Sequence, residues 1–268
     1  MTPVTDRQGK FSPLKTATLA LALLPALVIS YWFLTDQLGP LAVKAALRLV
    51  GDWTIRLLII TLALTPLQRV LNYPKIALIR RMLGVTAFAY ALAHFLLYIA
   101  NVKYDLVFVA SEIILRIYLT IGFVALLGLS LLAATSFDAA VRRLGKKWKL
   151  LHQSVYGIAA LGLLHYFIQT KADVSPATLM AGFYFLLMVY RVFINQRIAL
   201  KPPVLAASAL IAAILTVITE FAWYGLATGI DPWRIAQANF LFTFGLRPAI
   251  IVLLVGLTPC GFLILRSA

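Results

Sequence analysis

Long apolar runs separated by short polar segments dominate the chain. A helix needs about 20 mainly apolar residues to cross the hydrocarbon core of a bilayer. Eight stretches approach that length, at residues 16–35, 45–66, 82–100, 113–134, 150–170, 177–194, 204–224 and 240–265. The first is longer than the apolar part of a signal peptide and lacks a clear cleavage site, so we interpret it as an uncleaved anchor. The pattern predicts an all-α, polytopic membrane helix bundle.

Composition supports this class of protein. Of the 268 residues, 62% are hydrophobic and 12% are charged, whereas a soluble domain carries about 25% charged residues. The formal net charge is +15. On a membrane chain such an excess usually reports topology, because Lys and Arg gather in cytoplasmic loops. Most of the basic residues fall into alternate loops if the N-terminus is cytoplasmic. We therefore expect membrane lipids, and no nucleic acid, as partners of this basic chain.

The polar segments between the spans are too short for a soluble domain. The chain contains no G-x-x-x-x-G-K-[ST] phosphate loop and no G-x-G-x-x-G dinucleotide motif. It is therefore not expected to bind a nicotinamide cofactor in a conventional domain of its own. No internal repeat of the kind that builds many transporters is evident.

All three histidines fall within predicted spans. Ionisable residues inside a membrane are costly and indicate a functional site by default, although a lone His is often only an interhelical hydrogen-bonding residue. His94 lies 13 residues after Arg81, a rise of about 20 Å, and His165 lies 15 residues after Leu150, a rise of roughly 22 Å. The two are expected at similar depth, towards the outer leaflet. Facing imidazoles on parallel helices are typical of a haem with two axial His ligands.

Several neighbours of this pair are candidates for the same site. Gly162, three residues before His165, leaves room for a flat macrocycle or simply for close helix packing. Tyr90 and Tyr98 flank His94 four residues away on either side. Each is a candidate to bind haem propionates or cap the pocket, and a packing or interfacial role is equally consistent with the pattern.

His152 is expected to lie away from the pair formed by His94 and His165. It precedes His165 by 13 residues, which puts it on another helix face, about 140° away, and about 20 Å lower, near the cytoplasmic edge. It could ligate the iron of a second haem, line a quinone or flavin site, or act as an interfacial polar residue. The single Cys and the lack of carboxylates beside His94 and His165 make a zinc centre improbable.

The residues around the histidines resemble a known family. The strings R-R-x-L-G-x9-H-x3-Y from Arg80, L-G-x-x-W-x-x-L-H-x3-Y from Leu144 and L-H-Y from Leu164 look like MsrQ, formerly called YedZ. This resemblance covers roughly residues 15–197. It implies a ferric-reductase-like transmembrane core of six helices that binds haem b and FMN. It also implies electron transfer from the quinone pool to a periplasmic molybdopterin subunit, MsrP, which reduces methionine sulfoxide in oxidised envelope proteins.

The resemblance also implies a bacterial inner-membrane location and carries His94, His152 and His165 over as the motif histidines. On this basis we expect a cytoplasmic tail at residues 1–15, the haem-binding core at 16–197, and an extension with two further helices at 198–268. The extension contains Glu220 and Arg247, to which the resemblance assigns no role.

One departure from the family pattern lies in the fourth predicted span. Family members usually have Arg-Pro where this chain has Arg116-Ile117, and the missing proline is expected to remove a kink at the outer rim. Glu112 is spaced to pair with Arg116 there.

Two alternatives to the MsrQ interpretation stay open. One is a ferric or other haem-linked membrane reductase that acts with another partner. The other, from a different class, is a transporter whose histidines are polar contacts between helices.

Overall fold

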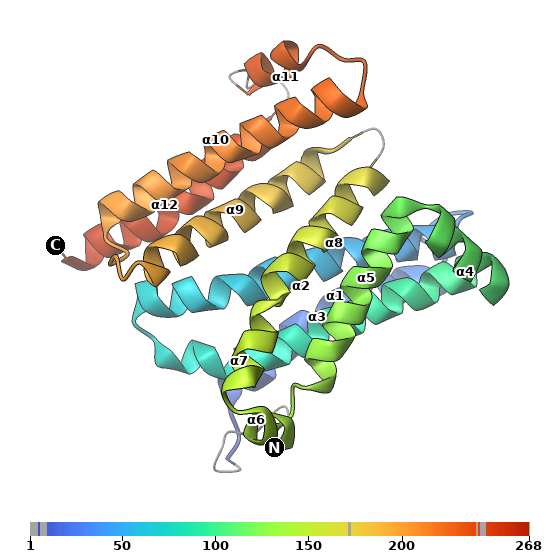
Figure 1. The fold of residues 1–268 in the computed structure, drawn as a ribbon, viewed down its shortest axis with the longest axis horizontal. Coiled ribbons are helices and arrows are strands. Elements are labelled where there is room, and N and C mark those ends of the chain that lie inside the picture. Colours follow the sequence, from blue (N-terminus) through green and yellow to red (C-terminus); the bar gives the residue numbers. More distant parts are fainter. Residues whose placement is uncertain (1–4, 6–9, 171–172, 240, 242–244, 268) are drawn as a thin grey trace. The chain divides into compact units, whose positions relative to one another are not determined.

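A computed structural model describes residues 5, 10–170, 173–239, 241 and 245–267. Its regular structure is helical, as the apolar pattern predicts (Figure 1). Most of the predicted N-terminal tail, and Phe240 at the start of the last predicted span, lie outside the described residues. The chain divides into two compact units: Met1–Leu64 with Lys75–His165 (unit 1), and Thr65–Pro74 with Tyr166–Ala268 (unit 2).

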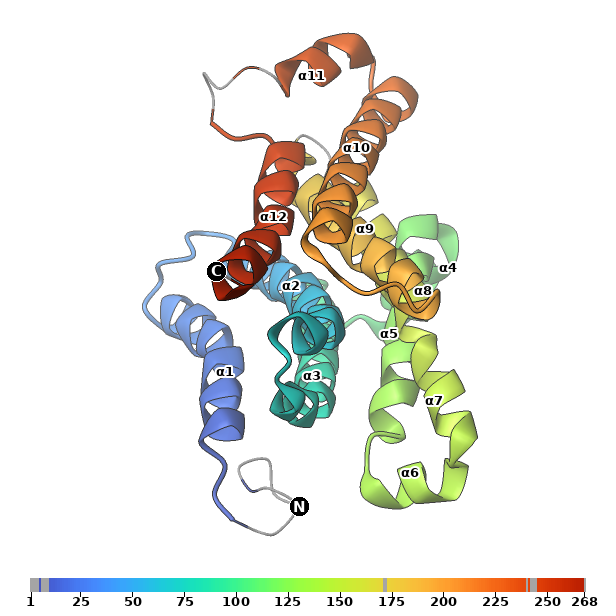
Figure 2. The same cartoon turned by 90° about the vertical axis from the view of Figure 1, so that its left-hand side faces the viewer.

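Unit 1 contains every predicted site residue. Its helices are α1 (Pro13–Leu34), α2 (Ala42–Leu71) up to Leu64, α3 (Ala77–Asn101), α4 (Leu106–Leu115), α5 (Ile117–Ala134), α6 (Asp138–Leu144), α7 (Lys146–Gln153) and α8 (Val155–Gln169) up to His165. The short α6 connects α5 with α7 at one end of the unit (Figure 2). Gly145, with φ +50°, makes the sharp turn between α6 and α7.

Unit 2 is built on α9 (Ser175–Asn195), α10 (Pro202–Ala227) and α12 (Pro248–Ser267), with the short α11 (Pro232–Ala238) after α10. The three long helices pack through small residues, which let helix backbones approach closely in a membrane. A Cβ at Gly256 would lie 2.7 Å from the Cβ of Ala209, and Ala177 and Ala212 are fully buried. The sixth predicted span, α9, thus packs with the two helices of the predicted extension.

Among the described residues, six helices are long and apolar enough to cross a membrane by length and composition: α1, α3 together with a preceding 3-10 turn, α5, α9, α10 and α12. Two of the eight predicted spans are not among them. The α2 helix is 30 residues long but carries Arg48, Asp52 and Arg56, and the fifth span is divided at Ser154 into α7 and α8. The chain is an all-α, multi-pass membrane protein.

The prediction of one continuous helix over 113–134 is wrong. The backbone of Arg116 is extended, with φ −111° and ψ 105°, and it separates α4 from α5. Glu112 and Arg116 form the expected ion pair, and the hydroxyl of Thr120 donates to the carbonyl of Ile113 at 2.5 Å. The turn therefore persists without a proline, because side chains satisfy the backbone that the break exposes. The expected loss of a kink at Ile117 is also wrong.

The last predicted span begins later than the apolar pattern indicates. The α12 helix starts at Pro248, a residue tolerated in the first turn of a helix because it has no N–H to donate. Gly245 precedes it with φ +92°, a conformation that ends regular structure for most residues. The prediction of a helix is therefore wrong at residues 245–247, while its predicted start at 240 lies outside the described residues.

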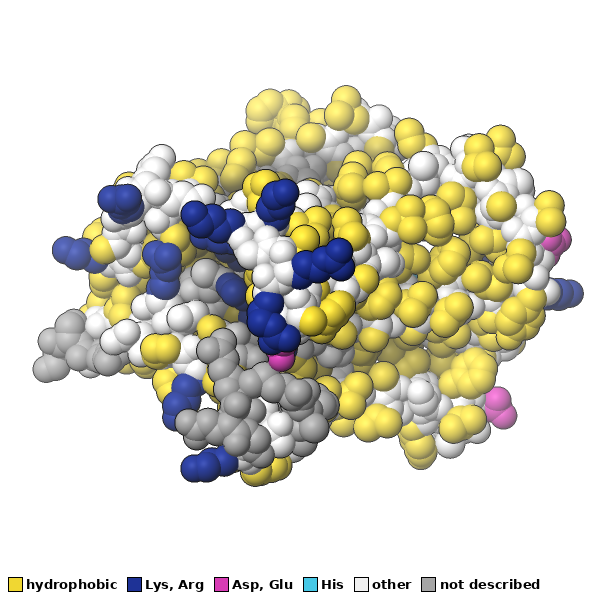
Figure 3. All heavy atoms as spheres, turned by 60° about the horizontal axis from the view of Figure 1, so that its bottom comes forward, with side chains coloured by type: hydrophobic (Ala, Val, Ile, Leu, Met, Phe, Trp, Pro, Cys, Tyr) yellow, Lys and Arg dark blue, Asp and Glu magenta, His cyan; other side chains and the backbone are white. Residues whose placement is uncertain are grey.

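Basic side chains gather around the end of unit 1 that contains α6 and α7 (Figure 3). Arg81, near the start of α3, donates to Asp138 at the start of α6 at 2.6 Å. This hydrogen bond holds the pKa of Asp138 below its usual value. The start of α3 and the loop after α5 therefore lie at the same end of unit 1, as the predicted topology requires.

Candidate functional site

The structure brings His94 of α3 and His165 of α8 together. Their ring centroids are 6.3 Å apart, and the ring planes are nearly perpendicular, at 85°. The two residues are 71 positions apart in the sequence and lie on different helices. The pairing that equal depth predicts is therefore present in the fold.

Each histidine is fixed by a backbone carbonyl of a neighbouring helix. The Nδ1–H of His94 donates to the carbonyl of Leu47 on α2 at 2.9 Å, and that of His165 donates to the carbonyl of Tyr118 on α5 at 2.7 Å. Because a carbonyl oxygen can only accept, Nδ1 must carry the proton in both rings. The neutral ring then has an unprotonated Nε2 with its lone pair available, which is the form that binds a metal ion.

A glycine lies against each imidazole. A Cβ on Gly51 of α2 would lie 2.7 Å from Nδ1 of His94, and a Cβ on Gly122 of α5 would lie 2.7 Å from Nδ1 of His165. Real Cβ atoms are essentially never found this close to another heavy atom. Only glycine at these two positions lets the imidazole reach the carbonyl one helical turn earlier.

The two histidine sites repeat one arrangement. In each, the carbonyl acceptor lies 47 residues before the histidine and the glycine lies 43 residues before it. The first copy uses α2 and α3, and the second uses α5 and α8. The whole sequence shows no evident repeat, yet this short spacing recurs with an offset of 71 residues. The repeat brings together two imidazoles that are held in the same way.

The distance between the rings fits a metal ion with two axial imidazoles. Metal–nitrogen bonds of about 2 Å and a ring nitrogen about 1 Å from its ring centre give centroids roughly 6 Å apart, and 6.3 Å is observed. Within the described residues, no three His, Cys, Asp or Glu side chains form a group that could hold a metal ion. A two-ligand site leaves the equatorial positions to a macrocycle, so the pair fits haem better than zinc.

His152 has a different environment. Its Nδ1–H donates to the carbonyl of Trp148 at 3.1 Å, and its Nε2 lies 3.2 Å from the hydroxyl oxygen of Ser136. Its ring also stacks on Trp148, with centroids 3.8 Å apart. Nδ1 carries the proton, so only Nε2 has a lone pair. That lone pair faces the Ser136 hydroxyl, which also donates to the carbonyl of Leu132 at 2.7 Å. Of the three alternatives for His152, this geometry favours an interfacial polar residue.

The hydroxyl of Tyr90 is committed to the backbone of α1. It donates to the carbonyl of Ala22 at 2.8 Å and accepts from the N–H of Ala26 at 2.9 Å. It is thereby inserted between two groups that would otherwise bond to each other within the helix, next to Pro25. Tyr90 therefore connects α3 to α1, and the packing alternative describes it better than propionate binding.

The remaining two predicted site residues lie near the histidines in different roles. Tyr98 interacts electrostatically with Glu112 and Arg116, at the break between α4 and α5. A Cβ on Gly162 would lie 3.2 Å from Cδ1 of Ile55 on α2. Gly162 thus allows α8 to approach α2, which is the helix-packing alternative.

The residues that hold the imidazoles in place were not among the predicted site residues; they are Leu47, Gly51, Tyr118 and Gly122. Leu47 and Tyr118 act through their backbone carbonyls, so their side chains give no signal. The glycines did leave one, because the spacing from Gly51 to His94 equals that from Gly122 to His165.

Comparison with known proteins supports a haem-related site. Residues 50–163 match the model of the ferric reductase like transmembrane component. Curated relatives named protein-methionine-sulfoxide reductase heme-binding subunit MsrQ include one from Polaromonas naphthalenivorans, 44% identical over 54% of this chain and 67% of the relative. Another, from Herminiimonas arsenicoxydans, is 38% identical over 67% and 84%, and one from Rhodospirillum rubrum is 37% identical over 69% and 88%. No solved structure matches the chain.

Proposed function

Because the chain belongs to the MsrQ family, we propose that it is a haem b protein of the bacterial inner membrane, with a cytoplasmic N-terminus. In this role it carries electrons from the quinone pool to the periplasmic methionine sulfoxide reductase MsrP. The observation that carries the proposal is the pair of imidazoles, 6.3 Å apart, with both Nδ1 atoms tied to carbonyls. FMN stays a prediction from the family resemblance alone.

The residues of the site would act by orientation. His94 and His165 would hold the haem through Nε2, and the carbonyls of Leu47 and Tyr118 would fix the tautomer and make each Nε2 more basic. Bound between them, the haem supplies one-electron redox chemistry. Two side chains that both hold the haem would suit electron transfer better than binding of an exogenous ligand.

The chemistry of donor and acceptor balances. Oxidation of a quinol to a quinone releases two electrons and two protons. Reduction of methionine sulfoxide to methionine and water consumes two electrons and two protons. The chain therefore needs only to pass single electrons in turn, and a chain without a nucleotide-binding motif suits a membrane-soluble donor.

The first test is the optical spectrum of the purified full-length protein before and after reduction with dithionite. We expect a low-spin b-type haem spectrum, because two imidazoles give a strong axial field. Addition of oxidised MsrP to the reduced protein should then reoxidise the haem. A protein without a reducible chromophore would exclude the proposed function. A haem reoxidised by ferric chelates but not by MsrP would favour the alternative of a haem-linked reductase with another partner.

The glycines allow a sharper test of the site. Gly51→Ala and Gly122→Ala should each displace an imidazole, because the new Cβ would lie 2.7 Å from its Nδ1. Loss of the carbonyl hydrogen bond removes a group that orients a metal ligand, a change that typically lowers affinity 10- to 100-fold. The measurement is haem content per protein after purification, together with the rate of haem transfer to apomyoglobin.

Gly157→Ala on α8 is the matched control. A Cβ at Gly157 meets no heavy atom within 4 Å, so this variant should retain the haem content of the unmodified protein. Full haem content and an unchanged spectrum in both Gly51→Ala and Gly122→Ala would contradict the proposed geometry.

A further inference from the structure

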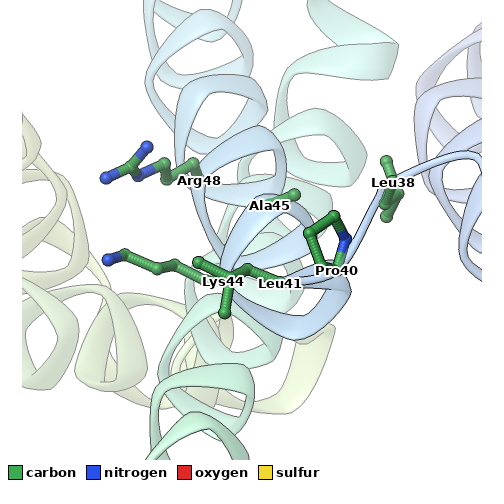
Figure 4. A pocket seen from close by; sticks show the side chains of 6 residues that line it. All are labelled: Leu38, Pro40, Leu41, Lys44, Ala45 and Arg48. Atoms are coloured by element: carbon green, nitrogen blue, oxygen red, sulfur yellow. The ribbon is translucent and has the colours of Figure 1, made fainter.

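A hollow of about 260 Å³ lies at the start of α2 in unit 1. It is lined by Leu38, Pro40, Leu41, Lys44, Ala45 and Arg48 (Figure 4). The lining is apolar except for the two cations, whose side chains point the same way from neighbouring turns of α2. In the predicted topology this end of α2 is on the outer side, where Lys and Arg are otherwise disfavoured.

The two cations have no anionic partner among the described residues. Across all the described residues, the cations that form ion pairs are Arg81, Arg116, Arg234 and Arg247. Lys44 and Arg48 are four residues apart, so two like charges lie side by side on one helix face, which destabilises the helix. An anion with two negative groups would offset this repulsion.

Lys44 and Arg48 lie on the same side of α2 as Gly51, the residue that lies against the His94 ring. Lys44 precedes Gly51 by seven residues, which puts the two within about 20° of each other around an ideal helix. Arg48 precedes Gly51 by three residues, about 60° away and roughly 5 Å further along the axis, and Lys44 is roughly 10 Å along. Passing outward from the His94 ring along this face, a ligand would meet first Arg48 and then Lys44.

The two copies of the repeated arrangement differ in charge. At the offset of 71 residues, the positions that match Lys44 and Arg48 are Leu115 and Leu119, and both are apolar. At these two matched positions, therefore, only the copy built on α2 carries cations. A ligand with an acidic edge and an apolar body would be oriented by this difference.

We propose that Lys44 and Arg48 bind the two propionate carboxylates of the haem held by His94 and His165, and so set its orientation in unit 1. The inference rests on the proposed function, because it requires a haem between these histidines. The contacts are charge-assisted, and such bonds are about twice as strong as neutral ones. The apolar residues of the hollow, Leu38, Pro40, Leu41 and Ala45, lie beside the two cations.

The test compares haem with its dimethyl ester, in which both carboxylates are neutral. Apoprotein of the full chain is reconstituted in detergent with each compound, and the dissociation constants are measured optically. The unmodified protein should prefer haem about tenfold or more, since esterification removes the charge-assisted hydrogen bonds of both carboxylates. The double variant Lys44→Met/Arg48→Met should bind the ester as before and lose the preference for haem.

Two further variants make the result specific. Arg48→Lys keeps the charge and should keep most of the preference. Lys103→Met removes an exposed cation in the loop after α3, outside the hollow, and should change nothing. A double variant that still prefers haem as strongly as the unmodified protein would overturn the inference, as would an effect confined to electron transfer to MsrP. If the unmodified protein binds neither compound, it is the proposed function that fails.

Discussion

Replacing either His94 or His165 by alanine should remove the haem from the purified protein. Each imidazole would supply one of two axial bonds, and the rings are positioned by separate helices, so neither can replace the other. Loss of even an outer-shell partner of a metal ligand typically costs 10- to 100-fold in affinity, and loss of the ligand itself should cost more. We therefore expect haem content to fall below a tenth of that in the unmodified protein. The measurement is the haem-to-protein ratio after purification.

His152→Ala is the informative comparison. Both nitrogens of His152 are engaged by Trp148 and Ser136, and its ring stacks on Trp148. We expect this variant to keep its haem and its low-spin spectrum. Addition of imidazole to His94→Gly or His165→Gly should restore part of the spectrum by filling the vacated axial position. A low-spin haem retained by His94→Ala and lost by His152→Ala would reverse the ligand assignment.

The second large effect is expected in unit 2, where Arg247→Met should destabilise the fold by about 3–5 kcal/mol. The carboxylate of Glu220 on α10 is 1% exposed, and it accepts from Nη2 of Arg247 at 2.5 Å and from Nδ2 of Asn239 at 3.3 Å. Removal of Arg247 leaves the carboxylate buried with only a neutral partner. Thermal unfolding of the full chain in detergent measures the loss.

Two comparisons make this prediction specific to a buried pair. The double variant Glu220→Gln/Arg247→Met should be more stable than Arg247→Met, because no charge then stays buried without its partner. Arg234→Gln breaks an ion pair with Asp231 that spans 4.0 Å between side chains 84% and 53% exposed. Such surface pairs contribute about 0–1 kcal/mol. An Arg247→Met variant no less stable than Arg234→Gln would show that the Glu220 pair contributes nothing to holding α10 and α12.

Apolar patterning predicted where most helices lie but was less reliable about where they break. Runs of apolar residues predicted the ends of α1, α3, α9 and α10. Most of these predicted ends lie within a few residues, or one helical turn, of the observed ones. The break at Arg116 was missed because nothing in the apolar pattern there interrupts a helix. It depends on contacts made only in the fold, where Thr120 donates to the carbonyl of Ile113. Pro248 and Gly245, by contrast, were visible signals for the start of α12.

The sequence also predicted some features of the candidate site and missed others. Residue counting along two helices was sufficient to pair His94 with His165, because helix rise is constant and the basic residues give a reference depth. It could not show that Tyr90 bonds to the backbone of α1 or that His152 has a partner at each nitrogen. Those facts depend on which helix faces which, and a single sequence does not report the neighbours of a helix.

The sequence by itself determined a multi-pass helical membrane protein, the scarcity of possible metal ligands and the matched depth of two histidines. Hydrophobicity, charge and helix rise are properties of local sequence, so they can be read directly. Only the tertiary structure decided which nitrogen of each histidine is free. That choice is made by the carbonyls of Leu47 and Tyr118, backbone groups of other helices that Gly51 and Gly122 leave accessible. A carbonyl has no side-chain identity, and it becomes a specific partner only when the chain has folded.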